Sequence, residues 1–149
     1  MNRIPAFLIF LGVVLFSCDG NRVYEQFEEV PNQLWGFTDT IHYELQNLDS
    51  AEHFLVSVRF NEDYPYTNIY LKLLESDSSG TVLEEKLVNV ILFDPKSGKP
   101  LGNGFGGTRT LYDTLDYKIN MNASGLDILQ YMRVNQLKGI EAVGFKATK

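Results

Sequence analysis

Residues 53–60 read HFLVSVRF, and this short stretch decides the fold class of the chain. Its even positions are all apolar, whereas His53, Ser57 and Arg59 occupy odd positions on the opposite side. An alternation of period two is typical of a β-strand that buries one face in a core and turns the other towards solvent. Residues 53–60 therefore predict a strand of this kind.

The same pattern recurs along most of the chain. Alternation runs through residues 40–46 and 69–73, and apolar segments of strand length occupy residues 86–93, 115–119, 128–134 and 140–147. Turn-forming residues lie between them at 63–65, 77–80, 94–98 and 122–125. Seven or eight short strands predict an all-β fold, an antiparallel β-sandwich of jelly-roll or immunoglobulin-like type. Residues 126–137 fit a helix or a strand, because their apolar residues match both periods.

The N-terminal residues carry an export signal. A positive head with Arg3 precedes an apolar run over residues 4–16, which is too short for a permanent membrane-spanning helix and is typical of a signal peptide. Residues 15–18, LFSC, resemble the lipobox of bacterial lipoproteins, in which the cysteine thiol receives diacylglycerol and the chain is cut before that cysteine. The resemblance implies a cleaved signal over residues 1–17 and a membrane-anchored chain that begins at Cys18, the only cysteine.

The remaining residues have the size and charge of one acidic domain. We divide them into a lipidated tether and docking arm at 18–35 and a β-sandwich domain at 36–149. Trp35, at the end of the arm, fits a core anchor better than a ligand platform. The formal charge of −6 becomes −7 when Arg3 leaves with the signal. A net-acidic body argues against nucleic acid as a partner.

No catalytic or metal-binding constellation stands out. Residues 102–107 match GxGxxG, but no strand and helix pattern surrounds them, so we expect a flexible loop whose glycines permit close approach by another backbone. His42 and His53 are the only histidines, and we expect both on outward strand faces, where two ligands make a poor zinc site. The acidic residues at 84–85, 113 and 116 mark no acid–base pair. The sequence thus predicts no cofactor, no metal and no enzymatic activity.

Three tripeptides resemble the Asp-Ser/Thr-aliphatic sequon at which exported proteins of gliding Bacteroidetes receive O-linked glycans. They are residues 39–41, 49–51 and 113–115. The alternative is a turn aspartate followed by a β-forming residue that starts a strand. Glycosylation would place the hydroxyls of Thr40, Ser50 and Thr114 in solvent.

Longer stretches resemble one family. Residues 18–25, Trp35, and residues 63–71, 101–104, 130–133 and 139–144 are similar, in the same order, to the gliding motility lipoprotein GldH family of Bacteroidetes. The resemblance covers essentially the whole mature chain. It implies a cell-envelope lipoprotein needed for gliding, tied to the motility apparatus and, for some members, to the type IX secretion machinery. It implies no enzymatic activity, cofactor or catalytic residue, and the residues after Cys18 favour the periplasmic side.

Two functions compete at this point. The first is a non-enzymatic structural or assembly component that meets protein partners through Tyr64, Pro65, Tyr66, Tyr131 and Arg133, since exposed Tyr and Arg make effective interface anchors. The other reading of Tyr66 and Tyr131 is that they pack in the core.

The second function is a periplasmic carbohydrate- or peptidoglycan-binding module, with Tyr43, Tyr64 and Tyr70 as a platform. A flat row of exposed rings on one sheet face would favour it, and buried rings would argue against it.

Overall fold

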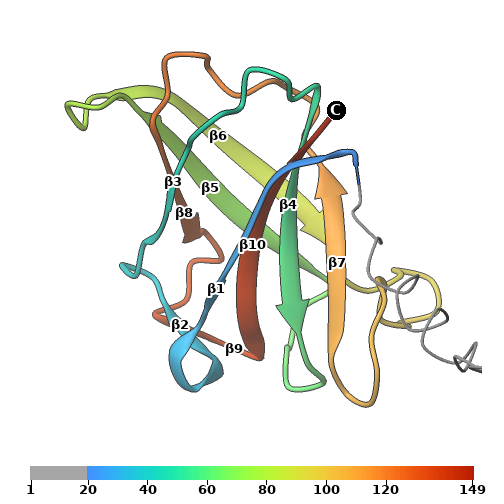
Figure 1. The fold of residues 1–149 in the computed structure, drawn as a ribbon. Coiled ribbons are helices and arrows are strands. Elements are labelled where there is room, and N and C mark those ends of the chain that lie inside the picture. Colours follow the sequence, from blue (N-terminus) through green and yellow to red (C-terminus); the bar gives the residue numbers. More distant parts are fainter. Residues whose placement is uncertain (1–19) are drawn as a thin grey trace, which may run out of the picture.

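The computed structural model describes residues 20–149 as strands joined by loops and a single short 3-10 turn (Figure 1). The strands and the turn are β1 (Arg22–Glu29), η3 (Pro31–Gln33), β2 (Leu34–Gly36), β3 (Ile41–Glu44), β4 (His53–Phe60), β5 (Asn68–Ser76), β6 (Val82–Ile91), β7 (Arg109–Thr114), β8 (Gly125–Gln130), β9 (Gln136–Lys138) and β10 (Ile140–Thr148). Cys18 and the leader lie outside the described residues. Within residues 20–149, no helix is long and apolar enough to cross a membrane.

The strands pair as one long antiparallel hairpin that is rolled up. Each strand of the first half pairs with its counterpart in the second half: β1 with β10, β2 with β9, β3 with β8, β4 with β7, and β5 with β6. Further pairs, β10 with β4 and β8 with β5, close the roll into two four-stranded sheets. The sheet orders are β1-β10-β4-β7 and β3-β8-β5-β6, with the β2–β9 ribbon beside them. This nested pairing is that of a jelly roll, so the jelly-roll alternative of the predicted sandwich is the correct one.

The inner faces of the two sheets form a single core. Alternate residues of β4 and β5 point inwards, including Val56, Val58 and Leu71, and each of these is fully buried. Tyr43 of β3 crosses the core and donates a hydrogen bond of 2.8 Å to the Val143 carbonyl of β10. The period-two prediction is therefore confirmed for the central strands, because one face of each packs against the opposite sheet.

The hairpin between β5 and β6 is closed by an aspartate. The Asp77 carboxylate accepts hydrogen bonds from the backbone N–H groups of Ser79 and Thr81 at 2.8 and 3.0 Å, and Gly80 adopts φ +84°. The Ser79 hydroxyl and these N–H groups lower the pKa of Asp77. An aspartate that bonds the backbone two residues on, followed by a glycine at positive φ, is the chemistry of a tight turn.

Several boundaries differ from those expected. Residues 22–35 contribute β1 and β2, so the sandwich begins well before residue 36. The predicted strand at 115–119 is a loop, and its alternation arises because Leu115 and Ile119 dip into the core from the end of the sandwich. The strand before it, β7, was not predicted. Residues 126–137 form β8, a turn and the start of β9, and no helix. The strand expected at 86–93 spans Val82–Ile91.

Because neighbouring strands are antiparallel, the loops gather at two opposite ends. We call one the terminal end: it carries Asn21, Lys149 and the loops 45–52, 77–81 and 115–124. We call the other the far end: it carries η3, the β2–β9 ribbon and the loops 61–67, 92–108 and 131–135. In Figure 1 the terminal end is at the top and the far end at the bottom.

Candidate functional site

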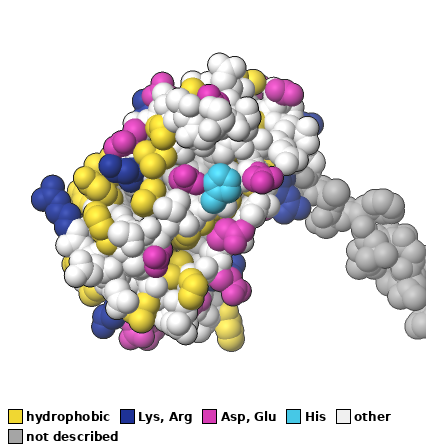
Figure 2. Space-filling view, turned by 90° about the vertical axis from the view of Figure 1, so that its left-hand side faces the viewer, with side chains coloured by type: hydrophobic (Ala, Val, Ile, Leu, Met, Phe, Trp, Pro, Cys, Tyr) yellow, Lys and Arg dark blue, Asp and Glu magenta, His cyan; other side chains and the backbone are white. Residues whose placement is uncertain are grey.

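Exposed apolar side chains concentrate at the far end. Ten large hydrophobic side chains are exposed among residues 20–149, and six of them lie in or beside far-end loops: Leu34, Phe37, Tyr66, Tyr70, Ile91 and Phe105. Figure 2 shows hydrophobic side chains gathering on the left and in the lower part of the surface, whereas the top is mostly white. Clustered exposed apolar side chains are typical of protein-contact surfaces.

One aromatic cluster is built from the β8–β9 turn and the segment after β2. The Phe37 ring stacks on Tyr131 with centroids 6.3 Å apart, and Lys72 Nζ lies 4.6 Å above the Tyr131 ring. The Phe37 N–H donates to the Asn135 carbonyl at 2.9 Å, which holds the two segments together. A hydrogen bond to Glu85 raises the pKa of Lys72, so this side chain stays cationic beside the ring.

The turn that presents Tyr131 also exposes Arg133. Arg133 adopts φ +58°, and its side chain is exposed. Met132, beside it, accepts a hydrogen bond from the Tyr70 N–H at 3.2 Å through its sulfur. Tyr131 is half-buried, so it combines packing with access to solvent. The structure therefore places Tyr131 and Arg133 together on the surface of the far end.

A second aromatic cluster underlies the loop 61–67. Tyr64 is only 5% exposed, its hydroxyl donates to the Asn68 carbonyl at 2.7 Å, and its ring is parallel to Phe93 at 6.4 Å. Burial raises the pKa of Tyr64. Tyr64 is thus a core residue and not the contact residue we expected. It supports Tyr66, whose ring lies 5.9 Å away and is 39% exposed, beside the exposed Pro65.

A groove of about 300 Å³ opens between the end of β1 and the start of β3. Both strands are the outer strands of their sheets. Val30 and Trp35 are buried beneath it, and Glu28, Glu29 and Asp39 line it. Of the described residues 20–149, no lysine or arginine lines it. Sequence reasoning missed this groove, because it divided the lining residues between the docking arm at 18–35 and the domain at 36–149, and did not place β1 beside β3.

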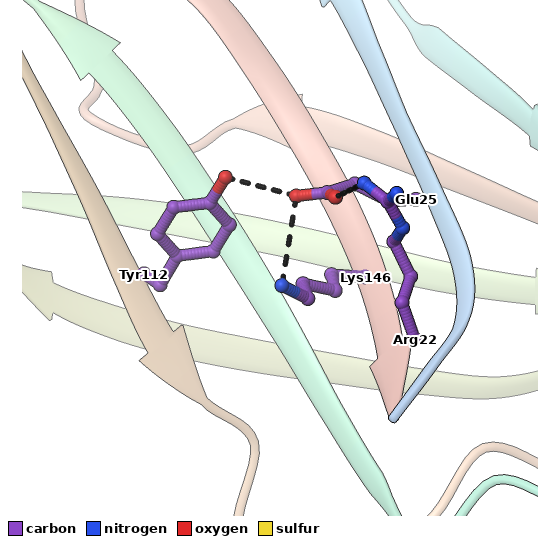
Figure 3. A network of polar contacts seen from close by, with 4 residues as sticks. All are labelled: Arg22, Glu25, Tyr112 and Lys146. Atoms are coloured by element: carbon purple, nitrogen blue, oxygen red, sulfur yellow. Dashed lines mark hydrogen bonds and ion pairs between the residues drawn. The ribbon is translucent and has the colours of Figure 1, made fainter. Parts of the chain in front are cut away.

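A polar network fixes β1 on its sheet (Figure 3). Glu25 accepts hydrogen bonds of 2.9 Å from Arg22 and from the Tyr112 hydroxyl of β7, and Lys146 Nζ of β10 lies 3.9 Å away. Burial tends to raise the pKa of Glu25, but the Arg22 and Tyr112 hydrogen bonds and the Lys146 charge outweigh it, so that this pKa is lowered. The strand that follows the tether is therefore tied to two other strands of the sheet.

The two histidines lie in different sheets, and the glycine loop packs against the chain's own backbone. His42 lies on β3, with Nδ1 2.6 Å from Asp127 Oδ1 of β8, whereas His53 lies on β4 in the other sheet. The strands of His42 and His53 therefore do not pair. Among residues 20–149 no group of three or more His, Cys, Asp or Glu side chains could hold a metal ion.

A Cβ at Gly102 would collide with the Thr110 carbonyl, so the close approach at this glycine is made by the chain's own backbone.

The residues proposed for a sugar platform do not form one. Tyr43 is fully buried and Tyr64 nearly so, which leaves Tyr70 as the only exposed member. The three hydroxyls of the candidate glycosylation sites, Thr40, Ser50 and Thr114, all belong to exposed residues.

Comparison with known proteins defines the class of the chain. Residues 22–147 match the family described as GldH lipoprotein. A gliding motility lipoprotein GldH homolog of Christiangramia forsetii is 32% identical, over 99% of this chain and 97% of the relative. Gliding motility lipoprotein GldH of Flavobacterium johnsoniae is 28% identical, over 93% of this chain and 92% of the relative. The fold and these matches define a jelly-roll protein of lipoprotein type.

The chain belongs to the GldH lipoprotein family. Among solved structures, dimeric latent PorU from Porphyromonas gingivalis is similar with a TM-score of 0.36 and 12% identity. That similarity covers 86% of this chain but only 13% of the PorU chain.

Proposed function

We propose that this protein is a lipid-anchored, non-enzymatic component of the cell envelope that assists assembly of the gliding apparatus linked to type IX secretion. Its family and the printed names of its relatives support a motility-associated lipoprotein. Cys18 is the attachment point for the acyl chains, each methylene of which contributes about 0.8 kcal/mol to membrane binding. The folded domain faces the periplasm.

The far-end surface contacts a protein partner in this proposal. The observation that carries it is that six of the ten exposed large hydrophobic side chains among residues 20–149 lie at one end of an acidic body. Tyr66, Tyr131 and Arg133 combine a rigid ring or a planar cation with partial exposure, as interface anchors do. A sugar-binding role has no comparable support, because Tyr43 and Tyr64 are buried.

Affinity purification from gently solubilised envelopes tests the proposal. Phe37→Ser removes an exposed ring at the far end, and Met121→Ser removes an equally apolar side chain, 71% exposed, at the terminal end. The tagged wild type and Met121→Ser should recover the same envelope proteins in stoichiometric amounts, and Phe37→Ser should lose them. Equal recovery by all three proteins, or recovery of the bait alone, would contradict the proposal.

We further propose O-linked glycans at Thr40, Ser50 and Thr114, whose exposure is a necessary condition for modification. Intact-mass measurement of the protein from its native host, compared with Thr40→Val, Ser50→Ala and Thr114→Val variants, tests each site. Each occupied site should lose one glycan mass on substitution. An unmodified wild-type mass would exclude all three.

A further inference from the structure

The chain between the anchor and the folded domain is very short. The Lys149 N–H donates a hydrogen bond of 2.9 Å to the Asn21 carbonyl, and Arg22 pairs with Thr148, so the chain is fixed to the sandwich from Asn21 onwards. Only three peptide units separate Cys18 from Asn21, and an extended chain advances at most about 3.6 Å per residue. The Asn21 backbone therefore lies within roughly 11 Å of the acylated cysteine.

Asn21 is rigidly connected to the rest of the terminal end. The Thr148 carbonyl accepts a hydrogen bond from the Glu52 N–H at 2.8 Å, which ties the loop 45–52 to the same corner. The loop 115–124 starts beside it, where the Leu115 N–H donates to the Phe54 carbonyl at 2.8 Å. Whatever holds Asn21 near the membrane also holds these two loops near it.

The surface chemistry of the terminal end limits which lipids it can face. Its exposed side chains are mostly short and polar, with Met121 and Val82, the latter directly after the loop 77–81, as the large apolar exceptions. Acidic residues outnumber lysines in its loops and at the C-terminus: Asp49, Glu52, Asp77 and Asp116 stand against Lys118 and Lys149. Polybasic clusters are what bind anionic lipids, and this end has none among the described residues.

We propose that the terminal end rests against zwitterionic lipid headgroups and that the sandwich stands upright on the membrane. This inference rests on lipidation of Cys18, as set out under the proposed function. The nine residues of β10 run from the far end to the terminal end and span about 30 Å at 3.3 Å per residue. The far-end surface is thereby carried about 30 Å away from the lipid, where a partner reaches it freely. Ser50 lies on the headgroup side, whereas Thr40, which precedes β3 near the far end, stays clear of it.

Site-specific fluorescence quenching on the lipidated, full-length mature protein tests the orientation. Acylation consumes Cys18 and the chain has no other cysteine, so an introduced cysteine is the only free thiol. Ser50→Cys labels the terminal end and Asn135→Cys labels the far end, and both positions are exposed. Each labelled protein is placed in phosphatidylcholine vesicles that carry a nitroxide quencher on the headgroup.

The label at position 50 should be quenched severalfold more strongly than the label at position 135. A ten-residue Gly/Ser insertion after Asp19 should weaken quenching at position 50, because the domain then moves away from the bilayer. Equal quenching at both positions, or stronger quenching at 135, would overturn the upright orientation. Failure of the protein to float with the vesicles would instead contradict the anchoring in the proposed function, so the two failures are distinguishable.

Discussion

Replacement of Trp35 by alanine should destabilise the whole sandwich. Trp35 is 1% exposed, pairs with Leu137 in the β2–β9 ribbon, and donates its indole N–H to the Asp39 carbonyl at 2.9 Å. Truncation of a buried aromatic side chain to alanine costs about 3–5 kcal/mol, since a cavity replaces the ring. For a domain the size of residues 20–149, the unfolding entropy makes each kcal/mol worth about 3.7 °C, so the melting temperature should fall by roughly 11–18 °C.

The assay is thermal unfolding followed by far-ultraviolet circular dichroism, because Trp35 is the only tryptophan and its fluorescence is lost in the variant. Trp35→Phe is the matched control: it keeps an apolar ring, loses the indole hydrogen bond, and should lower the melting temperature by only about 4–8 °C. A fall below about 4 °C for Trp35→Ala would refute the reasoning that Trp35 anchors the core. It would restore the interpretation of Trp35 as a ligand platform in the groove between β1 and β3.

Three further substitutions should change the stability of the domain in different directions or with different pH dependence. Glu75 is buried, and its Oε1 has no hydrogen-bond partner within residues 20–149. Burial raises the pKa of Glu75, so the protonated side chain stabilises the fold at low pH and this stabilisation is lost as the pH rises above 4.5. Glu75→Gln should therefore raise the melting temperature by about 4 °C at pH 7 and leave it unchanged at pH 3. The pKa of Glu25 is lowered, so Glu25→Gln should instead destabilise at pH 7, by no more than about 1 kcal/mol, and its effect should shrink as the pH falls below the ordinary pKa of a glutamate. Gly139 has φ +82°, and a Cβ there would collide with the Tyr64 backbone. Gly139→Ala should therefore lower the free energy of unfolding, measured by denaturant titration, by about 1–3 kcal/mol. An unchanged denaturant midpoint would contradict this expectation.

Sequence reasoning succeeded where a strand is buried on one face only. In β3 and β5 the inward residues meet the opposite sheet and most outward residues are exposed or half-buried. The strand β4 was also predicted, but Ser57 on its outward face is only 1% exposed, so that the expectation of a solvent-facing Ser57 was wrong. The strands β1 and β7 were missed, because their residues do not alternate between buried and exposed, unlike those of β3, which is also an outer strand. The loop at 115–119 was predicted as a strand because its alternate residues are apolar. They are apolar because the loop covers one end of the core and turns alternate side chains inwards.

Strand order lies beyond the reach of local patterns. Arg22 pairs with Thr148, from opposite ends of the chain, and no periodicity within one segment specifies such a partner. The same limit applies to the candidate site. Tyr66 and Tyr131 were both identified from the sequence, but only the nested pairing reveals that they share one end. Phe37 and Phe105 escaped notice, because the sequence around an exposed aromatic residue in a loop carries no sign of its exposure.

The nested pairing also connects the fold to the proposed function. Pairing of β1 with β10 brings both ends of the described residues 20–149 to one end of the sandwich, away from the far end. Within residues 20–149, all the exposed aromatic side chains except Tyr112 lie at the far end. Anchoring and partner contact are thus separated along the length of the sandwich, so that one surface can change without altering the other.

Photo-crosslinking in the living host tests this separation most directly. A benzophenone amino acid at position 66 samples the far end, and the same residue at position 121 samples the terminal end, both at exposed sites. We expect a discrete crosslinked protein adduct from position 66 and none from position 121, where lipid is the neighbour. A protein adduct from position 121 with none from position 66 would contradict this separation.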